Sequence, residues 1–348
     1  MSDAATKLGL SRDTWEIAQA VRAVLADVMA SHPLRVEPDE TVRRTRLTEL
    51  HAVLTEGSWA EVALGEFGLL TAVAEVAATV PATPAYPLVE MWLAHRVLDR
   101  LGRRDIAEPG RLVVADVTAP LEPDGDAGVP FGPFTDVVLR LEPRWDKDFD
   151  VLAVEASGAQ WTLLDDTDAT RPLHTPAPGA VTGLGVLRTE DALTIAAEFA
   201  VLEAAEMLGC ADTLFRATVR HVSHREQFGK PLSANQVVRH RMADAYTQLE
   251  SVRSLVRYAG WVADTDASRL GEFAFVAKGL AGEYCWDVLD EAFQLHGAIG
   301  CTAELGLQHP AARIMTRTMS PPTSADCLVR TGSAVLARGS IAALLEET

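Results

Sequence analysis

The stretch Arg225-Glu-Gln-Phe-Gly-Lys-Pro-Leu232 lies between two long helical patterns, and its position indicates the fold of the C-terminal half of the chain. Before it, apolar residues recur at three- and four-residue steps from Val201 to Val219. After it, the same spacing continues from Val238 to Ala259. Such periodicity predicts two helices that pack along each other in a bundle. The Lys230-Pro231 pair is typical of a turn, so the stretch connects the two helices at one end of that bundle.

A second informative stretch, Gln294-Leu-His-Gly-Ala-Ile-Gly300, follows about 70 residues later. It ends a third helical pattern, which carries Val276, Leu280, Tyr284, Val288 and Ala292. The glycines let a ligand approach the backbone closely, and the Gln294 amide can hydrogen-bond an adenine or a ribose. The simpler reading is a glycine that ends a helix in a tight turn.

The first stretch has the chemistry of a phosphate site. Arg225 carries a guanidinium with bidentate donors for a pyrophosphate, and the helix that begins near Gln236 adds backbone N–H groups and a favourable dipole. The Phe228 ring can pack against a heterocycle. The alternative is a surface arginine that caps the last carbonyls of its own helix.

Outside these stretches the chain divides into three regions, which we predict at residues 1–104, 105–188 and 189–348. The first contains four helical patterns, at 11–31, Thr41–Leu54, Trp59–Val80 and Val89–Leu101. The second contains short apolar runs separated by Pro, Gly and Asp, which read as strands. These runs are Leu112–Ala115, Asp136–Leu141, Val151–Val154 and Trp161–Leu164. The predicted fold is mainly α, with a small β domain between two helical ones.

Composition excludes several function classes. The chain has 348 residues and a formal net charge of −18, which disfavours nucleic acid and anionic membranes as partners. Its four cysteines lack zinc-ligand spacing, so we expect no metal, and Cys210 and Cys285 are expected to be buried free thiols. No signal-like segment and no apolar run near eighteen residues is present, which predicts a cytoplasmic protein.

The two stretches resemble motifs of the acyl-CoA dehydrogenase family. Residues Arg220–Gln236 are similar to the pattern Y-A-x-x-R-x-Q-F-G-x-P-x-x-x-F-Q, and Gln294–Glu304 are similar to Q-x-H-G-G-I-G-F-T-x-E. The resemblance covers roughly residues 190–315, and further upstream only Trp59-Ala-Glu and Gly65-Glu-Phe-Gly68 are similar. It implies an N-terminal helical domain, a middle β domain and a C-terminal four-helix bundle.

The resemblance also implies FAD as the cofactor. Arg225, Gln227 and Phe228 would contact its pyrophosphate or adenine side across a subunit interface, and Gln236 matches the Gln after the turn. Further residues match the segment that closes on the ADP half of the flavin of a neighbouring chain, namely Gln294, Gly297 and Ala298. Two positions depart from the pattern, because Asn235 stands in place of Phe and Ala298 in place of the second Gly.

Acyl-CoA dehydrogenation requires a carboxylate that takes the α-proton, and the sequence does not supply one at the expected places. The segment from Arg313 to Ser324, where many family members carry this Glu, contains no acidic residue. The alternative family position falls on Phe199, beside Glu198, which is a weak candidate; Glu203 and Glu206 are weaker. The motifs of the β domain that cover the flavin ring are also missing.

Three hypotheses follow from the resemblance. The leading one is a subunit without a base of its own, resembling the shorter chain of the α2β2 acyl-CoA dehydrogenases of actinobacterial sterol catabolism. Its partners would be a longer acyl-CoA dehydrogenase chain in a heterotetramer, an acyl-CoA substrate and an electron-transfer flavoprotein. The alternatives are a self-sufficient homo-oligomeric enzyme using Glu198 or another carboxylate, and a flavin-free scaffold.

Overall fold

The computed structural model describes residues 70–78, 86–107, 111–115, 128–144, 147–165, 167–177 and 181–337, with scattered helical positions between 16 and 52. Most of the predicted N-terminal helices at 11–31 and Thr41–Leu54, and the start of Trp59–Val80, lie outside the described residues. The end of the third appears as α5 (Leu70–Ala77), and the predicted helix Val89–Leu101 is confirmed as α6 (Leu88–Leu101). No helix in the described ranges is both long and apolar enough to cross a membrane.

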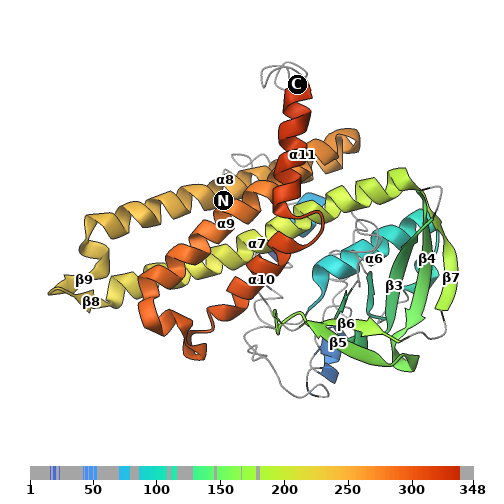
Figure 1. Cartoon of the computed structure of the whole chain (residues 1–348), viewed down its shortest axis with the longest axis horizontal. Helices are drawn as coiled ribbons and strands as arrows, with labels where there is room; N and C mark the ends of the chain where they lie inside the picture. The colour runs from blue at the N-terminus through green and yellow to red at the C-terminus, as the bar shows by residue number, and fades with distance from the viewer. Residues whose placement is uncertain are drawn as a thin grey trace.

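Three long helices form the body of the C-terminal half. They are α7 (Thr189–His224), α8 (Gln236–Thr265) and α9 (Leu270–His296), and they run side by side (Figure 1). Two shorter helices, α10 (Gln308–Met319) and α11 (Ser324–Ala337), follow along the chain and pack on α9. The predicted helix–turn–helix arrangement is therefore confirmed, including the start of α8 at Gln236.

The predicted apolar seams are confirmed in part. On α8, the buried residues include Val238, Ala245 and Val252 at the predicted steps. On α9, Val276 and Leu280 are only half-buried, and the buried positions before Val288 are mainly small residues, namely Ala274, Ala277, Gly279, Ala281, Gly282 and Cys285. Because α9 packs against α7, α8 and α11, its centre favours side chains that permit close approach, and the larger residues lie beside that seam.

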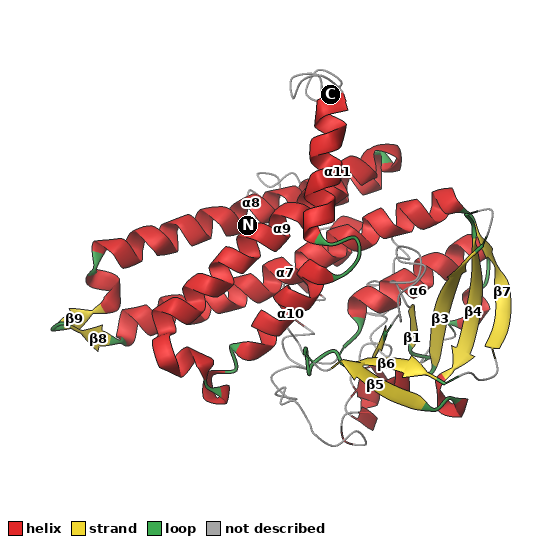
Figure 2. Cartoon of the chain, viewed as in Figure 1, coloured by secondary structure: helices red, strands yellow, loops and turns green. Residues whose placement is uncertain are grey.

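The β domain contains two small sheets at one end of the molecule (Figure 2). The larger has the strand order β1 (Val113–Ala115), β3 (Val137–Pro143), β4 (Phe149–Glu155), β7 (Val181–Leu187), with β1 parallel to β3 and the other pairs antiparallel. The smaller has the order β2 (Val129–Pro130), β6 (Leu173–Pro176), β5 (Trp161–Asp165). The four predicted strand runs are confirmed, and β2, β6 and β7 were not predicted.

Continuous apolar runs suit β1 and the first part of β3 because both faces of these strands are buried. Val113 and Ala115 belong to the core that extends through α6 and the helical bundle. Val114, which points to the opposite face, packs in a second core with Phe131 and Phe134. The predicted fold class, mainly helical with a small β domain, is thus confirmed, while the domain limits at 104 and 188 stay predictions.

One half-buried histidine makes the stability of this core depend on pH. Burial lowers the pKa of His95 on α6 from 6.5 to about 4, and the opposing charge of Asp99 is too weak to restore it. Below pH 6.5 the unfolded chain therefore binds a proton at this imidazole, whereas the folded chain binds it only near pH 4.

We expect the free energy of unfolding to fall by about 2 kcal/mol between pH 7 and pH 5 through this group alone. Urea unfolding should show a smaller fall for His95→Gln and an unchanged one for His240→Gln, whose ring is exposed.

Candidate functional site at the end of the helical bundle

The two motif stretches, far apart in sequence, meet at one end of the bundle. The first follows the C-terminus of α7, and the second begins in the last turn of α9. The imidazole rings of His221 and His296 join them, because they stack with centroids 4.4 Å apart and an interplanar angle of 30°. Figure 1 shows the hairpin of the first stretch, labelled β8 and β9, at the end of the bundle remote from the β domain.

The hairpin has an unusual turn. Strands β8 (Glu226–Gln227) and β9 (Lys230–Pro231) are joined by Phe228 and Gly229, whose φ angles are +57° and +75°. Two positive φ angles in a two-residue loop are the signature of a type I′ turn, which ordinarily takes Asn-Gly. A phenylalanine in the left-handed region is rare, and its ring is 90% exposed. The turn therefore holds a large apolar ring in solvent, although its backbone conformation is unfavourable for phenylalanine.

Arg225 lies directly before this hairpin, with its side chain exposed. Its backbone is tied at both sides, because its N–H donates to the His221 carbonyl at 2.8 Å and its carbonyl accepts from the Leu232 N–H at 2.9 Å. The guanidinium is exposed and has no ion pair with any described residue. Nearby, the N-cap residue Asn235 of α8 makes no side-chain cap bond, so the first N–H groups of this helix are open to an anion.

The remaining predicted residues share this exposed end. Gln227 lies on β8, and Gln236 opens α8, where its Nε2 lies 3.5 Å from Nε2 of His240. Gln294 is exposed in the last turn of α9. Gly297 follows with φ +64° and ψ −148°, a conformation open essentially to glycine, and nothing lies within 4 Å of its missing Cβ. Ala298 is exposed in the 3-10 helix η6 (Gly297–Cys301), so the structure groups all seven predicted cofactor residues at one solvent-facing end.

A second feature is a cavity of about 390 Å³ between the β domain and the bundle. Its walls combine β-domain residues such as Pro130 and Leu173 with Phe199 of α7 and the α10 end from Met315 to Pro321. This last segment is the one in which the family resemblance places a base, and it brings no carboxylate to the cavity. Among the described lining residues the one acid is Glu203, a helical turn after Phe199.

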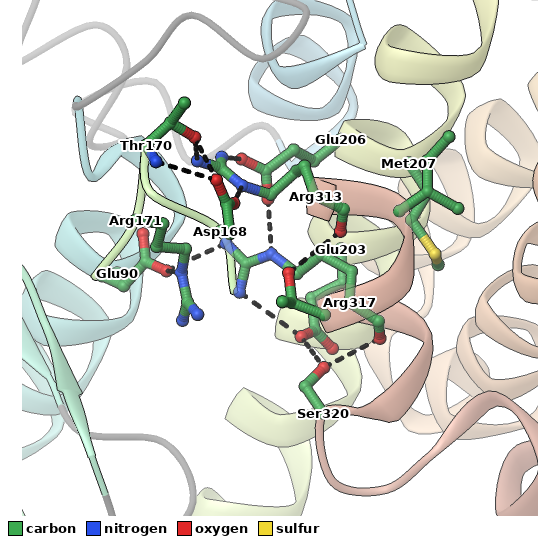
Figure 3. Close-up of polar contacts among 12 residues, drawn as sticks. Glu90, Asp168, Thr170, Arg171, Glu203, Glu206, Met207, Arg313, Arg317 and Ser320 are labelled. Carbon is green, nitrogen blue, oxygen red and sulfur yellow. Dashed lines mark hydrogen bonds and ion pairs between the residues drawn. The ribbon is translucent and has the colours of Figure 1, made fainter. Parts of the chain in front are cut away.

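Behind this cavity lies a buried cluster of paired charges, which we call the charge cluster (Figure 3). Four acids and four bases from five parts of the chain take part: Glu90, Asp168, Glu203, Glu206, Arg171, Lys278, Arg313 and Arg317. All are about 10% exposed or less in their side chains, apart from Glu206 at 11%. The formal charges within the cluster cancel, which is the condition under which buried ions are tolerated.

Arg317 is the centre of the charge cluster. Its Nε donates to Glu206 at 2.5 Å and its Nη2 to Glu90 at 2.9 Å, while Nη1 lies 3.5 Å from Glu203. Arg313, one turn earlier on α10, binds Asp168 and Glu206. The ion pairs therefore connect α6, the β5–β6 loop, α7 and α10 to one another.

Glu203 is held by three donors. Lys278 of α9 donates to its Oε2 at 2.5 Å, and the Ser320 hydroxyl and Arg317 donate to Oε1. The Lys278 ammonium also donates to the Ser320 carbonyl at 2.8 Å, so the loop after α10 is fastened to the same pair. Glu203 thus lines the cavity as a structural anion.

Electrostatics favour the ionised forms of Glu90 and Arg317 within the charge cluster. Burial alone would raise the pKa of Glu90, but Arg317 and Arg171 lower it to about 2. For Arg317, burial disfavours the charge, yet Glu206, Glu90 and Glu203 raise its pKa further above the usual range for arginine. Glu90 and Arg317 consequently carry their charges at neutral pH, and removal of one partner leaves others unpaired in a dry interior.

Glu198, the weak candidate for the base, lies elsewhere. Its carboxylate is buried against α6 and accepts two bonds from Arg96, from Nε at 2.6 Å and from Nη2 at 2.5 Å. It does not line the cavity. Neighbouring positions on a helix differ by about 100°, so Phe199 faces the cavity while Glu198 faces α6.

We expect Glu198→Gln to leave turnover unchanged in an active complex, because this carboxylate contacts no part of the cavity. The substitution should instead lower the free energy of unfolding by about 1–3 kcal/mol, the usual value of a charge-assisted hydrogen bond. Steady-state kinetics and urea unfolding of the same preparation measure both. Lost turnover at unchanged stability would contradict this assignment.

Sequence reasoning missed the charge cluster, although a signal was present. Glu203 and Glu206 are three residues apart in the most apolar part of α7, and Arg313 and Arg317 are four apart on α10. Such spacing places each pair on one face of its helix. The sequence predictions treat these acids as candidate bases and assign no role to Arg313 or Arg317.

Comparison with known proteins identifies the family of the bundle. Residues 192–321 match the family model described as acyl-CoA dehydrogenase, C-terminal domain. A curated relative, acyl-CoA dehydrogenase IpdE2 of Mycolicibacterium smegmatis, is 37% identical over 141 residues, which are 40% of this chain and 42% of the relative. The chain thus matches less than half the length of this relative.

Solved structures are similar over nearly the whole chain. One titled as a Tcur3481-Tcur3483 steroid ACAD G363A variant has a TM-score of 0.78 at 22% identity, covering 95% of this chain and 99% of that one. The ChsE4-ChsE5 complex from Mycobacterium tuberculosis has a TM-score of 0.74 at 19% identity, with coverages of 92% and 97%. A glutaryl-CoA dehydrogenase from Mycobacterium smegmatis in complex with FADH2 has a TM-score of 0.76 at 16% identity, with both coverages 97%. At these identities the similarity establishes the fold.

Proposed function

Because the chain belongs to the acyl-CoA dehydrogenase family, we propose that it is a subunit of an FAD-dependent acyl-CoA dehydrogenase that lacks a base of its own. Its role is to complete the FAD site of a longer partner chain, which supplies the carboxylate for α,β-desaturation of an acyl-CoA thioester. The observation that carries this proposal is the contrast between two regions of the bundle. Nucleotide-binding chemistry is exposed at the end that carries the hairpin, and paired charges fill the region where the bundle meets the β domain and α6.

The exposed end fits the nucleotide half of FAD. The exposed Arg225 guanidinium, which has no ion pair within the described part of the chain, and the open N-terminus of α8 suit a pyrophosphate, which carries negative charge and several acceptor oxygens. Phe228 offers an exposed ring for adenine, and the open backbone at Gly297 allows Gln294 to approach the same group. When bound, the flavin supplies hydride acceptance, and the residues named here bind and orient its nucleotide part.

The cavity beside the β domain is unsuited to proton abstraction. The cavity wall from Met315 to Pro321 contains no acid, and Glu203 is held by Lys278, Ser320 and Arg317. Arg171, Glu203 and Arg317 of the charge cluster form part of the cavity wall, and each is already engaged in an ion pair within the cluster. This arrangement supports a structural role for this region and a partner chain that carries out the chemistry.

The proposed partner is a longer acyl-CoA dehydrogenase chain in a heterotetramer, consistent with structural neighbours whose titles name two-component assemblies. One of these titles names a steroid acyl-CoA dehydrogenase, which supports a sterol-derived acyl-CoA as the substrate class. A neighbour titled electron-transferring flavoprotein is compatible with an electron-transfer flavoprotein as acceptor. A cytoplasmic location remains part of the proposal.

The test is the absorbance spectrum of the chain purified alone and after co-expression with a longer acyl-CoA dehydrogenase chain encoded beside it. We expect no flavin bands from the single chain, and flavin bands with activity from the complex. Stoichiometric FAD and turnover in the chain alone would refute the proposal and favour the self-sufficient enzyme. A colourless complex would favour the flavin-free scaffold.

A further inference from the structure

Two histidines outside the predicted site connect its halves. His221 lies one helical turn before Arg225, and His296 lies two residues after Gln294. Their rings are stacked at 4.4 Å. The proposed function assigns neither residue a role, yet their rings form a direct contact between the end of α7 and the end of α9.

His296 is fixed in place from its own side. It is buried, and its Nδ1 lies 2.7 Å from the Ala292 carbonyl, which orients the ring. The backbone of η6 lies against it, since a Cβ at Gly300 would be only 2.9 Å from the His296 Cβ. The Gly300 backbone therefore packs directly against the base of the His296 side chain.

The backbone of His221 is hydrogen-bonded to the segment that contains Arg225. Its carbonyl accepts the Arg225 N–H at 2.8 Å, and the Arg225 carbonyl accepts the Leu232 N–H at 2.9 Å. The end of α7, Arg225 and the start of the next turn thus form one hydrogen-bonded unit. The stack joins this unit to the glycine loop.

We propose that His221 and His296 are positioning residues that hold the Arg225 segment and the Gln294–Gly300 segment at the separation required by one nucleotide. The inference rests on the proposed function, because it assumes that both segments bind the same FAD. The ring contact makes the two segments one pre-organised surface, so that binding does not have to order them separately.

The experiment combines substitution with rescue. In the co-expressed complex we expect His221→Ala and His296→Ala each to weaken FAD binding about 3- to 10-fold, the range for loss of one ring contact. The double variant should be no weaker than the weaker single variant, because both remove the same contact. His221→Tyr, which keeps a ring, should restore most of the affinity. His224→Ala is the matched control, since this exposed imidazole bonds only the Arg220 carbonyl of its own helix.

A second measurement does not involve FAD. Hydrogen exchange of residues 297–301 in the full chain without cofactor should accelerate in His221→Ala and return toward the wild-type rate in His221→Tyr. If His296→Ala fails to fold, the half-buried His221 carries the test by itself.

The outcomes separate the two proposals. If Arg225→Ala weakens FAD binding while both histidine variants stay within twofold of wild type, the positioning role is wrong and the proposed function stands. Additive losses in the double variant would also overturn it. If neither Arg225 nor the histidines affect FAD binding, the proposed function fails, and unchanged exchange of residues 297–301 would then refute the positioning role independently.

Discussion

Arg317→Leu is expected to destabilise the folded chain by about 3–5 kcal/mol, a large part of the stability of an ordinary domain. The substitution removes the cation that serves Glu206, Glu90 and Glu203 while it leaves these carboxylates buried. The cost comes mainly from unpaired charge, because leucine restores part of the lost volume. Urea unfolding followed by far-UV circular dichroism measures the difference.

The matched control is Arg216→Leu on α7. Arg216 also pairs with an acid, Asp212 at 2.5 Å, but its side chain is 68% exposed. Such a pair contributes about 0–1 kcal/mol, so its loss should hardly move the unfolding midpoint. Equal effects of the two substitutions would mean that burial of the charge cluster does not determine its energetic importance.

Arg225→Ala is expected to have the largest effect on cofactor content. The guanidinium has no partner among the described residues, so its loss should not destabilise the fold, but it removes the charged donors for the pyrophosphate. Charged hydrogen bonds of about 1.5–3 kcal/mol correspond to FAD binding that is roughly 10- to 150-fold weaker. The flavin absorbance of the purified complex and titration of the apo complex with FAD measure this loss.

Two further variants sharpen the test. Arg220→Ala removes an exposed arginine from the last turns of the same helix and should leave FAD content unchanged. Arg225→Lys keeps the charge but not the planar fork of donors, and should bind with intermediate affinity. Flavin content that is the same in Arg225→Ala and wild type would exclude this segment from the nucleotide site.

Local signals predicted much of this protein correctly. The three- and four-residue periodicity identified α7 and α8, and Lys230-Pro231 marked the turn between them. The buried seam of α8 and the buried thiols Cys210 and Cys285 were also predicted. These features depend on residues that are near in sequence or on the tendency of apolar groups to leave water.

Other predictions depended on neighbours that the sequence does not show. Val219, placed in the apolar seam of α7, is 39% exposed. It lies in the turns of α7 that approach the open end of the bundle. On α9, the seam runs through small residues because three helices compete for that face. The period of the pattern was correct, but the direction of the buried face was decided by packing.

The sequence by itself determined helices α6 to α9, strands β1, β3, β4 and β5, the family resemblance and the absence of an acid between Arg313 and Ser324. Tertiary structure alone decided which charges neutralise each other. Glu90 and Arg317 are 227 positions apart, and their contact exists only after α6, α7 and α10 have packed. It also turned Glu198 toward Arg96 and brought His221 onto His296. Periodicity encodes helices through local contacts, whereas long-range pairing depends on how the finished helices meet.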